Sequence, residues 1–373
     1  MAGAPDRTMR MESPLAPRMR INGREVDYFC GTSYYCLHGH PQVIEAACAA
    51  TRRFGMGPGT GAAMQIYDDL QAALREWFGA DHVTYVISGY TSPMVMLQGL
   101  RDDVDLVLAD AASHYSVRDA MATLGLPVHC FRHLSPESLA EALAEHVRPG
   151  QRPAVVTDGV FPSSGALAPL PDYVQVMAGY DGARLCVDDS HGIGVLGDGG
   201  RGALEHHGVE GPRAHVAGTM SKAFGGLGGI VPCDRARAER IAANAGILRG
   251  ASPPPPAAAA AGLTGMRLLR ETPEMLASLR RNTAHMRQGL RDLGFDLPDT
   301  PVPIVTLRAS QRRQGADIAM LRDHLATQDI FTKLTPAGGY SDAPDEDSMR
   351  IAVFSGHRPE QIDRLLTTLA DRL

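Results

Sequence analysis

The sequence has no hydrophobic run that approaches membrane-spanning length, and its first 20 residues lack the apolar stretch of a signal peptide. Its six cysteines contain no CxxC pair and no framework spacing. There are no internal repeats, and no low-complexity tract beyond the Pro/Ala run at 252–261. These absences predict a protein of the reducing cytoplasm, in which a cysteine such as Cys186 is a small buried side chain.

An excess of charge of one sign is also missing. The net charge is −6 over 373 residues, with 21% of residues charged and 44% hydrophobic. This balance is typical of a globular protein with a sizeable core, and it predicts neither a nucleic acid nor a membrane as partner. Residues 1–20 combine proline, arginine and methionine without an apolar core, and we expect them to form a flexible or partner-contacting arm.

Lysine is rare in this sequence, and one lysine stands in an unusual place. Lys222 closely follows the apolar run 214–217, which predicts a short strand, and lies among hydroxyl residues and glycines. A lysine at the end of a buried strand is costly unless it loses its charge or becomes covalently linked, and a Schiff base with an aldehyde cofactor does both. Thr219 and Ser221 could supply hydroxyls to a phosphate. A surface lysine in a loop is the alternative that this stretch leaves open.

A second stretch, 185–194, is an apolar strand that ends in a carboxylate. Asp188 stands at the strand end, and His191 follows it. Ligands of open parallel sheets sit beyond the carboxyl ends of strands, where a carboxylate can pair with the protonated pyridine nitrogen of pyridoxal phosphate. The alternative is that Asp189 or Ser190 caps a helix N-terminus, which would explain one residue but not the whole cluster.

Taken together, the motifs Asp-Asp-Ser-His at 188–191 and Thr-Met-Ser-Lys at 219–222 resemble the α-oxoamine synthases. These enzymes are a branch of the aspartate-aminotransferase-like (fold type I) pyridoxal phosphate enzymes. The resemblance extends from about Tyr28 to the C-terminus. It implies a homodimer and an α/β fold with a mostly parallel, seven-stranded large domain and a smaller α+β C-terminal domain. We expect an N-terminal arm and small-domain segment at 1–45, the cofactor-binding domain at 46–270 and the small domain at 271–373.

The apolar pattern along the chain predicts alternating strands and helices. Helical spacing is clear at 66–79, where Leu70, Leu74 and Trp77 share one face and Trp77 is expected in the core. A charged helical run at 275–293 and a final amphipathic helix belong to the C-terminal domain. Strands are predicted at 82–88, 105–110, 153–161, 185–188, 214–217, 228–233, 302–307 and 349–354.

By resemblance, the contacts to the cofactor come from several segments. Lys222 carries the cofactor, and Asp188 keeps its ring nitrogen protonated. His114 stacks on the ring and assists proton transfer at the α-carbon of the substrate. A lone histidine is more often an ordinary loop residue, but the place of His114 after a predicted strand favours the catalytic role. His191 is an expected partner of the cofactor's phenolic oxygen. The relatives have a serine at the position of Pro162 as a second partner, and here either Ser163 takes over this contact or the hydrogen bond is absent.

The phosphate is expected where a strand, a tight turn and a helix N-terminus follow one another at 82–93. Backbone donors around Gly89 and Tyr90 should meet it there. The resemblance further suggests that Ser252 reaches the phosphate bound in the partner subunit.

Arg350 lies inside an otherwise apolar strand, where an arginine needs an anionic partner. The matching arginine of the relatives binds the amino-acid carboxylate, and a structural salt bridge to a glutamate or aspartate is the alternative. Thr32 stands near this carboxylate, at a position where the family has asparagine. The glycine-rich loop at 55–61 is shorter than in relatives. Other departures are Asp68 for a histidine, Pro93 for an asparagine and Pro162 for a serine.

The resemblance implies an enzyme that condenses an amino acid with an acyl thioester, carried by coenzyme A or an acyl carrier protein. The product would be an α-amino ketone, formed with loss of the carboxylate. No metal is implied. One alternative is another fold type I enzyme, such as an aminotransferase or a carbon–carbon lyase, with the same Lys222 and Asp188. The other is a non-catalytic scaffold, which only the departures at Thr32, Pro162 and 55–68 support.

Overall fold

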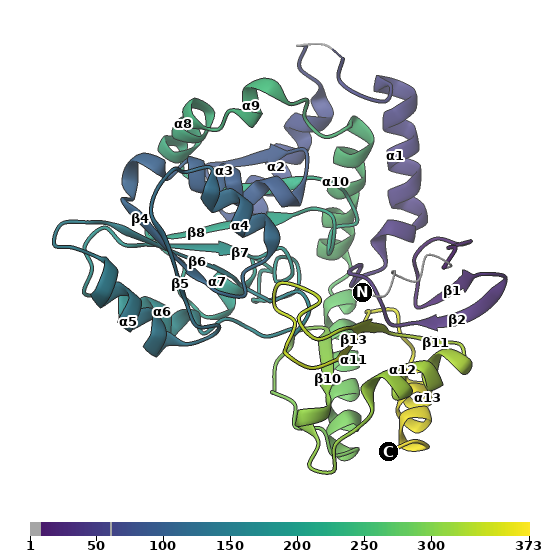
Figure 1. The fold of residues 1–373 in the computed structure, drawn as a ribbon. Helices are drawn as coiled ribbons and strands as arrows, with labels where there is room; N and C mark the ends of the chain where they lie inside the picture. The colour runs from purple at the N-terminus through teal and green to yellow at the C-terminus, as the bar shows by residue number, and fades with distance from the viewer. Residues whose placement is uncertain (1–8, 60–61) are drawn as a thin grey trace.

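The computed structural model describes residues 9–59 and 62–373. A large α/β part and a smaller C-terminal part lie side by side, and helix α11 (Glu274–Asp292) leads from one into the other (Figure 1). No helix of the described residues is both long and apolar enough to span a membrane. Positions 60 and 61 of the predicted glycine-rich loop lie outside the described residues.

A seven-stranded, mostly parallel sheet forms the centre of the large part, as predicted. The strand order is β3-β9-β8-β7-β6-β4-β5, and only β9 runs antiparallel to its neighbours. Every residue of β4 and β6 is buried, which is the pattern of parallel strands covered on both faces. The strands are β3 (His82–Val86), β4 (Leu106–Asp110), β5 (Val128–Phe131), β6 (Pro153–Asp158), β7 (Arg184–Asp188), β8 (Ala214–Thr219) and β9 (Gly229–Cys233).

Helices cover both faces of this sheet because successive strand residues point to opposite sides. On one face, Val155 and its neighbours pack against α5 (Pro136–His146) and α6 (Leu170–Met177). On the other face, Val156 and the buried Cys186 pack with α3 (Ser92–Gln98), α4 (Tyr115–Ala122) and α8 (Arg235–Asn244). The other helices of this part are α1 (Pro41–Phe54), α2 (Gln65–Phe78), α7 (Ala203–His206), α9 (Ile247–Gly250) and α10 (Pro256–Glu271).

Helix α2 confirms the helix predicted at 66–79. Leu70 and Leu74 are at most 1% exposed, and each contributes about 1.5–3 kcal/mol by leaving water. The ring of Trp77 meets Phe224 edge-on with centroids 5.0 Å apart, so Trp77 belongs to the core as predicted. Gly79 then ends the helix in a left-handed conformation, with φ of 60°, that suits glycine.

The C-terminal part contains two small sheets. In one, β13 (Ser348–Ala352) lies between β10 (Ile304–Arg308) and β12 (Lys333–Thr335), all antiparallel. In the other, β2 (Arg24–Tyr28) lies between β1 (Arg18–Ile21) and β11 (Ile330–Phe331). The remaining helices are α12 (Ile318–Thr327) and α13 (Pro359–Ala370).

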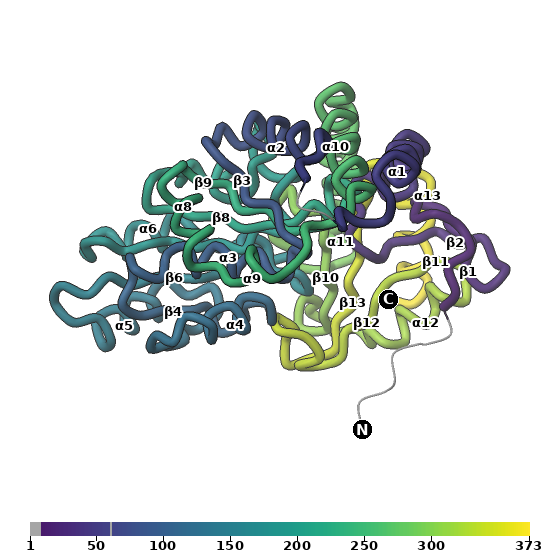
Figure 2. The backbone as a smooth tube through the Cα atoms, turned by 90° about the horizontal axis from the view of Figure 1, so that it is seen from above, coloured from purple at the N-terminus to yellow at the C-terminus, as the bar shows by residue number. Residues whose placement is uncertain are grey.

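Of the two alternatives for the arm at 1–20, the flexible one is wrong for residues 18–20, and the partner-contacting one stays a prediction. Met19 and Ile21 are buried, and β1 pairs in antiparallel register with β2. Because β2 also pairs with β11, backbone hydrogen bonds join this N-terminal segment to the C-terminal part, and Figure 2 shows the purple and yellow-green strands together. The sequence did not reveal strand β1, because an edge strand of four residues has only two buried positions, here Met19 and Ile21. The domain boundaries predicted at residues 45 and 270 stay predictions.

Candidate active site

The carboxyl ends of three parallel neighbours, β6, β7 and β8, open into one cavity of about 240 Å³. Segments far apart in the sequence meet here, since a parallel sheet gathers its strand ends at one edge. The predicted residues that line this cavity are Thr32, Gly89, Tyr90, His114, Asp188, His191, Thr219, Ser221 and Lys222. Ser163, Ser252 and Arg350 do not line it.

Lys222 lies at the wall of this cavity, just beyond the end of β8. Burial lowers the pKa of Lys222 to about 8, although the nearby carboxylates of Asp188 and Asp158 oppose this shift. A larger fraction of the amine is therefore neutral at physiological pH than in a solvated lysine. A neutral amine is the form that attacks an aldehyde.

Asp188 is held by three donors at the end of β7. Its Oδ1 accepts hydrogen bonds from the Ser190 hydroxyl at 2.7 Å and the Ser190 N–H at 3.2 Å. Its Oδ2 accepts from the Ser116 hydroxyl at 3.1 Å. These hydrogen bonds fix the orientation of the carboxylate at the cavity.

Asp158 is a cavity residue that the sequence reasoning missed. Its Oδ2 accepts the backbone N–H of His114 at 2.8 Å. Burial, followed by the neighbouring charge of Asp188, raises the pKa of Asp158 well above its usual value. Asp158 is therefore protonated more readily than an ordinary aspartate. The available signal was the position of Asp158 at the end of a predicted strand, the same position that marks Asp188.

The structure separates Asp188 from its neighbour Asp189. The Asp189 side chain points away to accept the backbone N–H of Ala203 at the start of α7, at 2.5 Å. Burial raises the pKa of Asp189 to about 8. Asp189 is not the N-cap residue of α7, which is Gly202, but it accepts the first N–H of that helix, whereas Asp188 faces the cavity.

His114 begins α4 and is fixed by it. The backbone N–H of Ser116 donates to Nδ1 at 3.2 Å, as in a helix cap, and the Ser116 hydroxyl lies 2.6 Å from the same nitrogen. Burial lowers the pKa of His114, so the ring is neutral at physiological pH. Its other nitrogen, Nε2, lies 2.9 Å from the hydroxyl of Tyr340, a contact that the sequence did not suggest.

His191 occupies the cavity wall beyond β7. Its Nδ1 forms a 2.6 Å hydrogen bond with the hydroxyl of Tyr34, a fully buried side chain. Burial holds the pKa of His191 well below its usual value, with the nearby charges of Lys222 and Arg350 adding to the shift. A neutral histidine held in one orientation can donate a hydrogen bond to a phenolic oxygen from its free nitrogen.

Hydroxyl groups and close backbone approach mark the expected phosphate end. A Cβ atom on Gly89 would lie 2.5 Å from the Thr219 side chain, so only glycine fits there. Thr219 Oγ1 donates to the Ser221 hydroxyl at 3.0 Å and accepts the Ser221 N–H at 3.0 Å. The Ser88 hydroxyl accepts the N–H of Tyr90 at 3.1 Å and also lines the cavity.

The groups that line the cavity fit pyridoxal phosphate. The cavity offers an amine of lowered pKa for the aldehyde, a charged carboxylate for the ring nitrogen and several hydroxyls for the phosphate.

Arg350, in β13, lies behind the cavity wall rather than on it. Its Nε donates to the Pro162 carbonyl at 2.9 Å, and Nη1 donates to the Gly31 carbonyl at 3.1 Å. Across residues 9–59 and 62–373, Arg350 forms no salt bridge with a carboxylate. The structural salt bridge considered as an alternative is therefore wrong for this part of the chain.

Two predicted contacts lie outside the cavity in this chain. Ser163 is buried, and its N–H donates to the carboxylate of Asp342. Ser252 is exposed. Pro93 lies in the first turn of α3, as predicted, and Asp68 is exposed on α2. The roles given to Ser163 and Ser252 stay predictions.

Comparison with known proteins agrees with this geometry. A family model described as aminotransferase class I and II matches residues 31–369. Relatives named 8-amino-7-oxononanoate synthase include one from Nitrosococcus oceani, 32% identical over 97% of this chain and 96% of its own. Another, from Methylococcus capsulatus, is 34% identical over 97% of this chain and 92% of its own.

Solved structures give the same result. A serine palmitoyltransferase variant from S. paucimobilis, with a bound PLP–myriocin aldimine, has a TM-score of 0.88 at 25% identity, over 98% of this chain and 92% of its own. The serine palmitoyltransferase from Sphingomonas wittichii has a TM-score of 0.84 at 27% identity, over 98% and 91%. The chain therefore belongs to the class I and II aminotransferases, and within them to the α-oxoamine synthases, which depend on pyridoxal phosphate.

Proposed function

We propose that this protein condenses an amino acid with an acyl thioester, releasing a free thiol and carbon dioxide and forming an α-amino ketone. The observation that supports this reaction most directly is that Lys222, Asp188 and His114 line one cavity. Relatives over nearly the full length of the chain carry names of enzymes of this class. Pyridoxal phosphate, when bound, supplies a ring that takes up negative charge from the α-carbon of the amino acid.

Each residue of the cavity has a role in this reaction. Lys222 holds the cofactor and, once the amino acid replaces it, can accept or return the α-proton. Asp188 keeps the ring nitrogen protonated with its charged carboxylate. His114 would hold the ring of the cofactor and assist proton transfer with its neutral imidazole, and His191 would donate to the phenolic oxygen. Thr219 and Ser221, with Ser88, hold the phosphate.

The test of the reaction is a pairwise screen of amino acids against acyl thioesters on coenzyme A and on an acyl carrier protein. Thiol release should require the amino acid. Release of carbon dioxide in an amount equal to the thiol would mean that the enzyme catalyses the decarboxylation. Consumption of the amino group by a keto acid, with no thiol released, would contradict the synthase and favour an aminotransferase. A protein that binds the cofactor but turns over none of these pairs would favour a scaffold.

Arg350 is proposed to bind the amino-acid carboxylate, together with Thr32. Replacing Arg350 with lysine should raise the KM for the amino acid by about tenfold or more, because lysine cannot copy the two-pronged guanidinium. Steady-state kinetics over a range of amino-acid concentrations measures this change.

The control for Arg350→Lys is Arg287→Lys. Arg287 is also buried and also donates to backbone carbonyls, those of Pro298, Val302 and Ile304. None of these three residues lines the cavity, whereas Pro162, which accepts from Arg350, does. Its replacement should lower the melting temperature and leave the amino-acid KM unchanged. An equal change of KM in both variants would show that Arg350 acts only through stability.

We also propose that the protein works as a cytoplasmic homodimer. The exposed position of Ser252, off the cavity of its own chain, supports a contact to the phosphate across a subunit boundary. The acyl donor is coenzyme A or a carrier protein, and the screen with both donors distinguishes them.

A further inference from the structure

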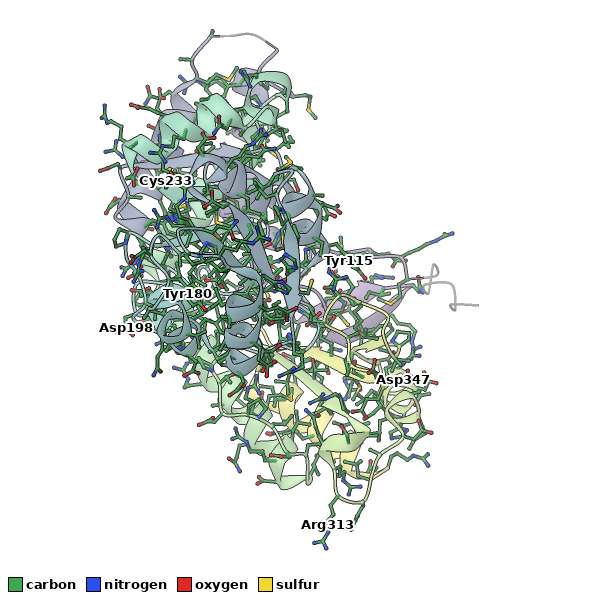
Figure 3. All side chains as sticks on the ribbon, turned by 60° about the vertical axis from the view of Figure 1, so that its left-hand side comes forward. Tyr115, Tyr180, Asp198, Cys233, Arg313 and Asp347 are labelled. Atoms are coloured by element: carbon green, nitrogen blue, oxygen red, sulfur yellow. The ribbon has the colours of Figure 1, made fainter. Side chains whose placement is uncertain are left out.

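A loop of the C-terminal part crosses to the large part beside the cavity. Residues 336–347 connect β12 to β13 and lie beside α4 in both Figure 1 and Figure 2. Figure 3 labels Tyr115 on α4, and Asp347 at the end of the loop that is farther from α4. The loop brings Tyr340 to His114, and the two residues are 226 positions apart in the sequence.

Asp342 anchors this loop to the large part. Its buried carboxylate accepts the N–H groups of Ser163 and Ser164 at 2.9 and 2.8 Å, and also the Ser164 hydroxyl at 2.9 Å. Three donors on one carboxylate form a strong attachment because one partner is charged. Tyr340, two residues earlier, is therefore held against the large part.

Other aromatic and cationic groups restrict the Tyr340 ring further. Tyr115 meets it edge-on with ring centroids 5.4 Å apart, and the Lys333 ammonium lies 5.5 Å from its centroid. Burial raises the pKa of Tyr340, so its hydroxyl stays protonated at physiological pH. These contacts, with the hydroxyl 2.9 Å from His114 Nε2, place the Tyr340 ring against α4.

The hydrogen bonds of His114 determine which nitrogen carries the proton. The backbone N–H of Ser116 cannot reverse its direction, so Nδ1 acts as an acceptor and carries no proton in the neutral ring. The Ser116 hydroxyl has one proton, which it can give either to Nδ1 or to Asp188. The ring proton is thus on Nε2, where the Tyr340 oxygen lies 2.9 Å away.

We propose that Tyr340 is a positioning residue for His114. The Tyr340 hydroxyl accepts the Nε2–H of His114 and fixes the orientation and tautomer of this imidazole at the cofactor site. Only the expected effect of Tyr340 on turnover rests on the proposed function. His114 is held from both sides, by α4 at Nδ1 and by the anchored loop at Nε2. The C-terminal part therefore takes part in orienting a group of the large part.

The test replaces Tyr340 with phenylalanine, which removes the hydroxyl and keeps the ring. The holoenzyme is labelled with ¹⁵N-histidine, and the His114 signals are assigned by their loss in His114→Gln. Wild-type His114 should be neutral and protonated at Nε2. In Tyr340→Phe this signal should shift or broaden, and kcat should fall about tenfold while the amino-acid KM changes less than about twofold.

The matched control is Tyr115→Phe, which removes the hydroxyl of the neighbouring ring and should change neither the His114 signal nor kcat. A wild-type His114 protonated at Nδ1 would overturn the proposal, and so would an unchanged His114 signal in Tyr340→Phe. If no pair of substrates is turned over, the proposed function fails, and the nitrogen spectra still decide the role of Tyr340.

Discussion

Replacing Lys222 with alanine is expected to abolish covalent attachment of pyridoxal phosphate and to lower the condensation rate by roughly a thousandfold or more, because the residue both carries the cofactor and moves the α-proton. The lowered pKa of Lys222, about 8, leaves enough neutral amine for attachment near neutral pH. The wild-type protein should be yellow and should lose this colour on borohydride reduction. Peptide mass spectrometry then locates the reduced label.

The sequence supplies a clear control for this experiment. Lys222 and Lys333 are its two lysines, so the label can stand at one of only two side chains. Lys333→Arg should keep the colour and the label on Lys222. Recovery of the reduced label on Lys333 would refute the assignment to Lys222. A Lys222→Ala variant that is yellow and carries a covalent label after reduction would refute it as well.

Replacing Asp188 with asparagine should leave cofactor binding largely intact and reduce turnover by roughly a hundredfold or more. A neutral amide cannot stabilise a positive charge on the ring nitrogen, and an unprotonated ring takes up less charge from the substrate. Both Ser190 donors can still reach the remaining carbonyl oxygen, and the Ser116 hydroxyl can accept from the new amide nitrogen, so the fold should persist. Single-turnover rates and the absorption spectrum of the bound cofactor measure the two effects.

Asp189→Asn is the matched control for Asp188→Asn. Burial raises the pKa of Asp189 to about 8, so this side chain is mostly neutral at pH 7 and an amide resembles it. Its oxygen can still accept the Ala203 N–H. Near-normal turnover in Asp188→Asn together with a large loss in Asp189→Asn would move the role to Asp189.

Much of the fold and part of the site followed from local patterns in the sequence. Fully apolar runs predicted the buried strands β4 and β6, because strands covered on both faces have no polar side. The spacing of Leu70 and Leu74 predicted a helix with one buried face, and α2 has it. The motifs around Asp188 and Lys222 follow strand ends, and a parallel sheet brings such ends to one edge, where both residues line the cavity.

Some sequence features predicted the right residue type but did not show which of two adjacent residues has the predicted role. Asp188 and Asp189 are adjacent and chemically identical, yet one faces the cavity and the other holds the start of α7. Successive residues at a strand end point in different directions, and only the packing around them decides which one meets the ligand. Arg350 was expected to need an anion, but in the structure the backbone carbonyls of Pro162 and Gly31 accept from two of its donors.

By itself, the sequence determined the parallel α/β sheet, the lysine and carboxylate at its strand ends, and the family to which they belong. Only the tertiary structure decided that Asp158 shares the cavity, that Asp342 anchors the loop before β13, and that Tyr340 meets His114. Local sequence patterns report which face of an element is buried, within a few turns of chain. Contacts between residues 179 or 226 positions apart depend on how two separately folded parts pack together, and no local pattern carries that information.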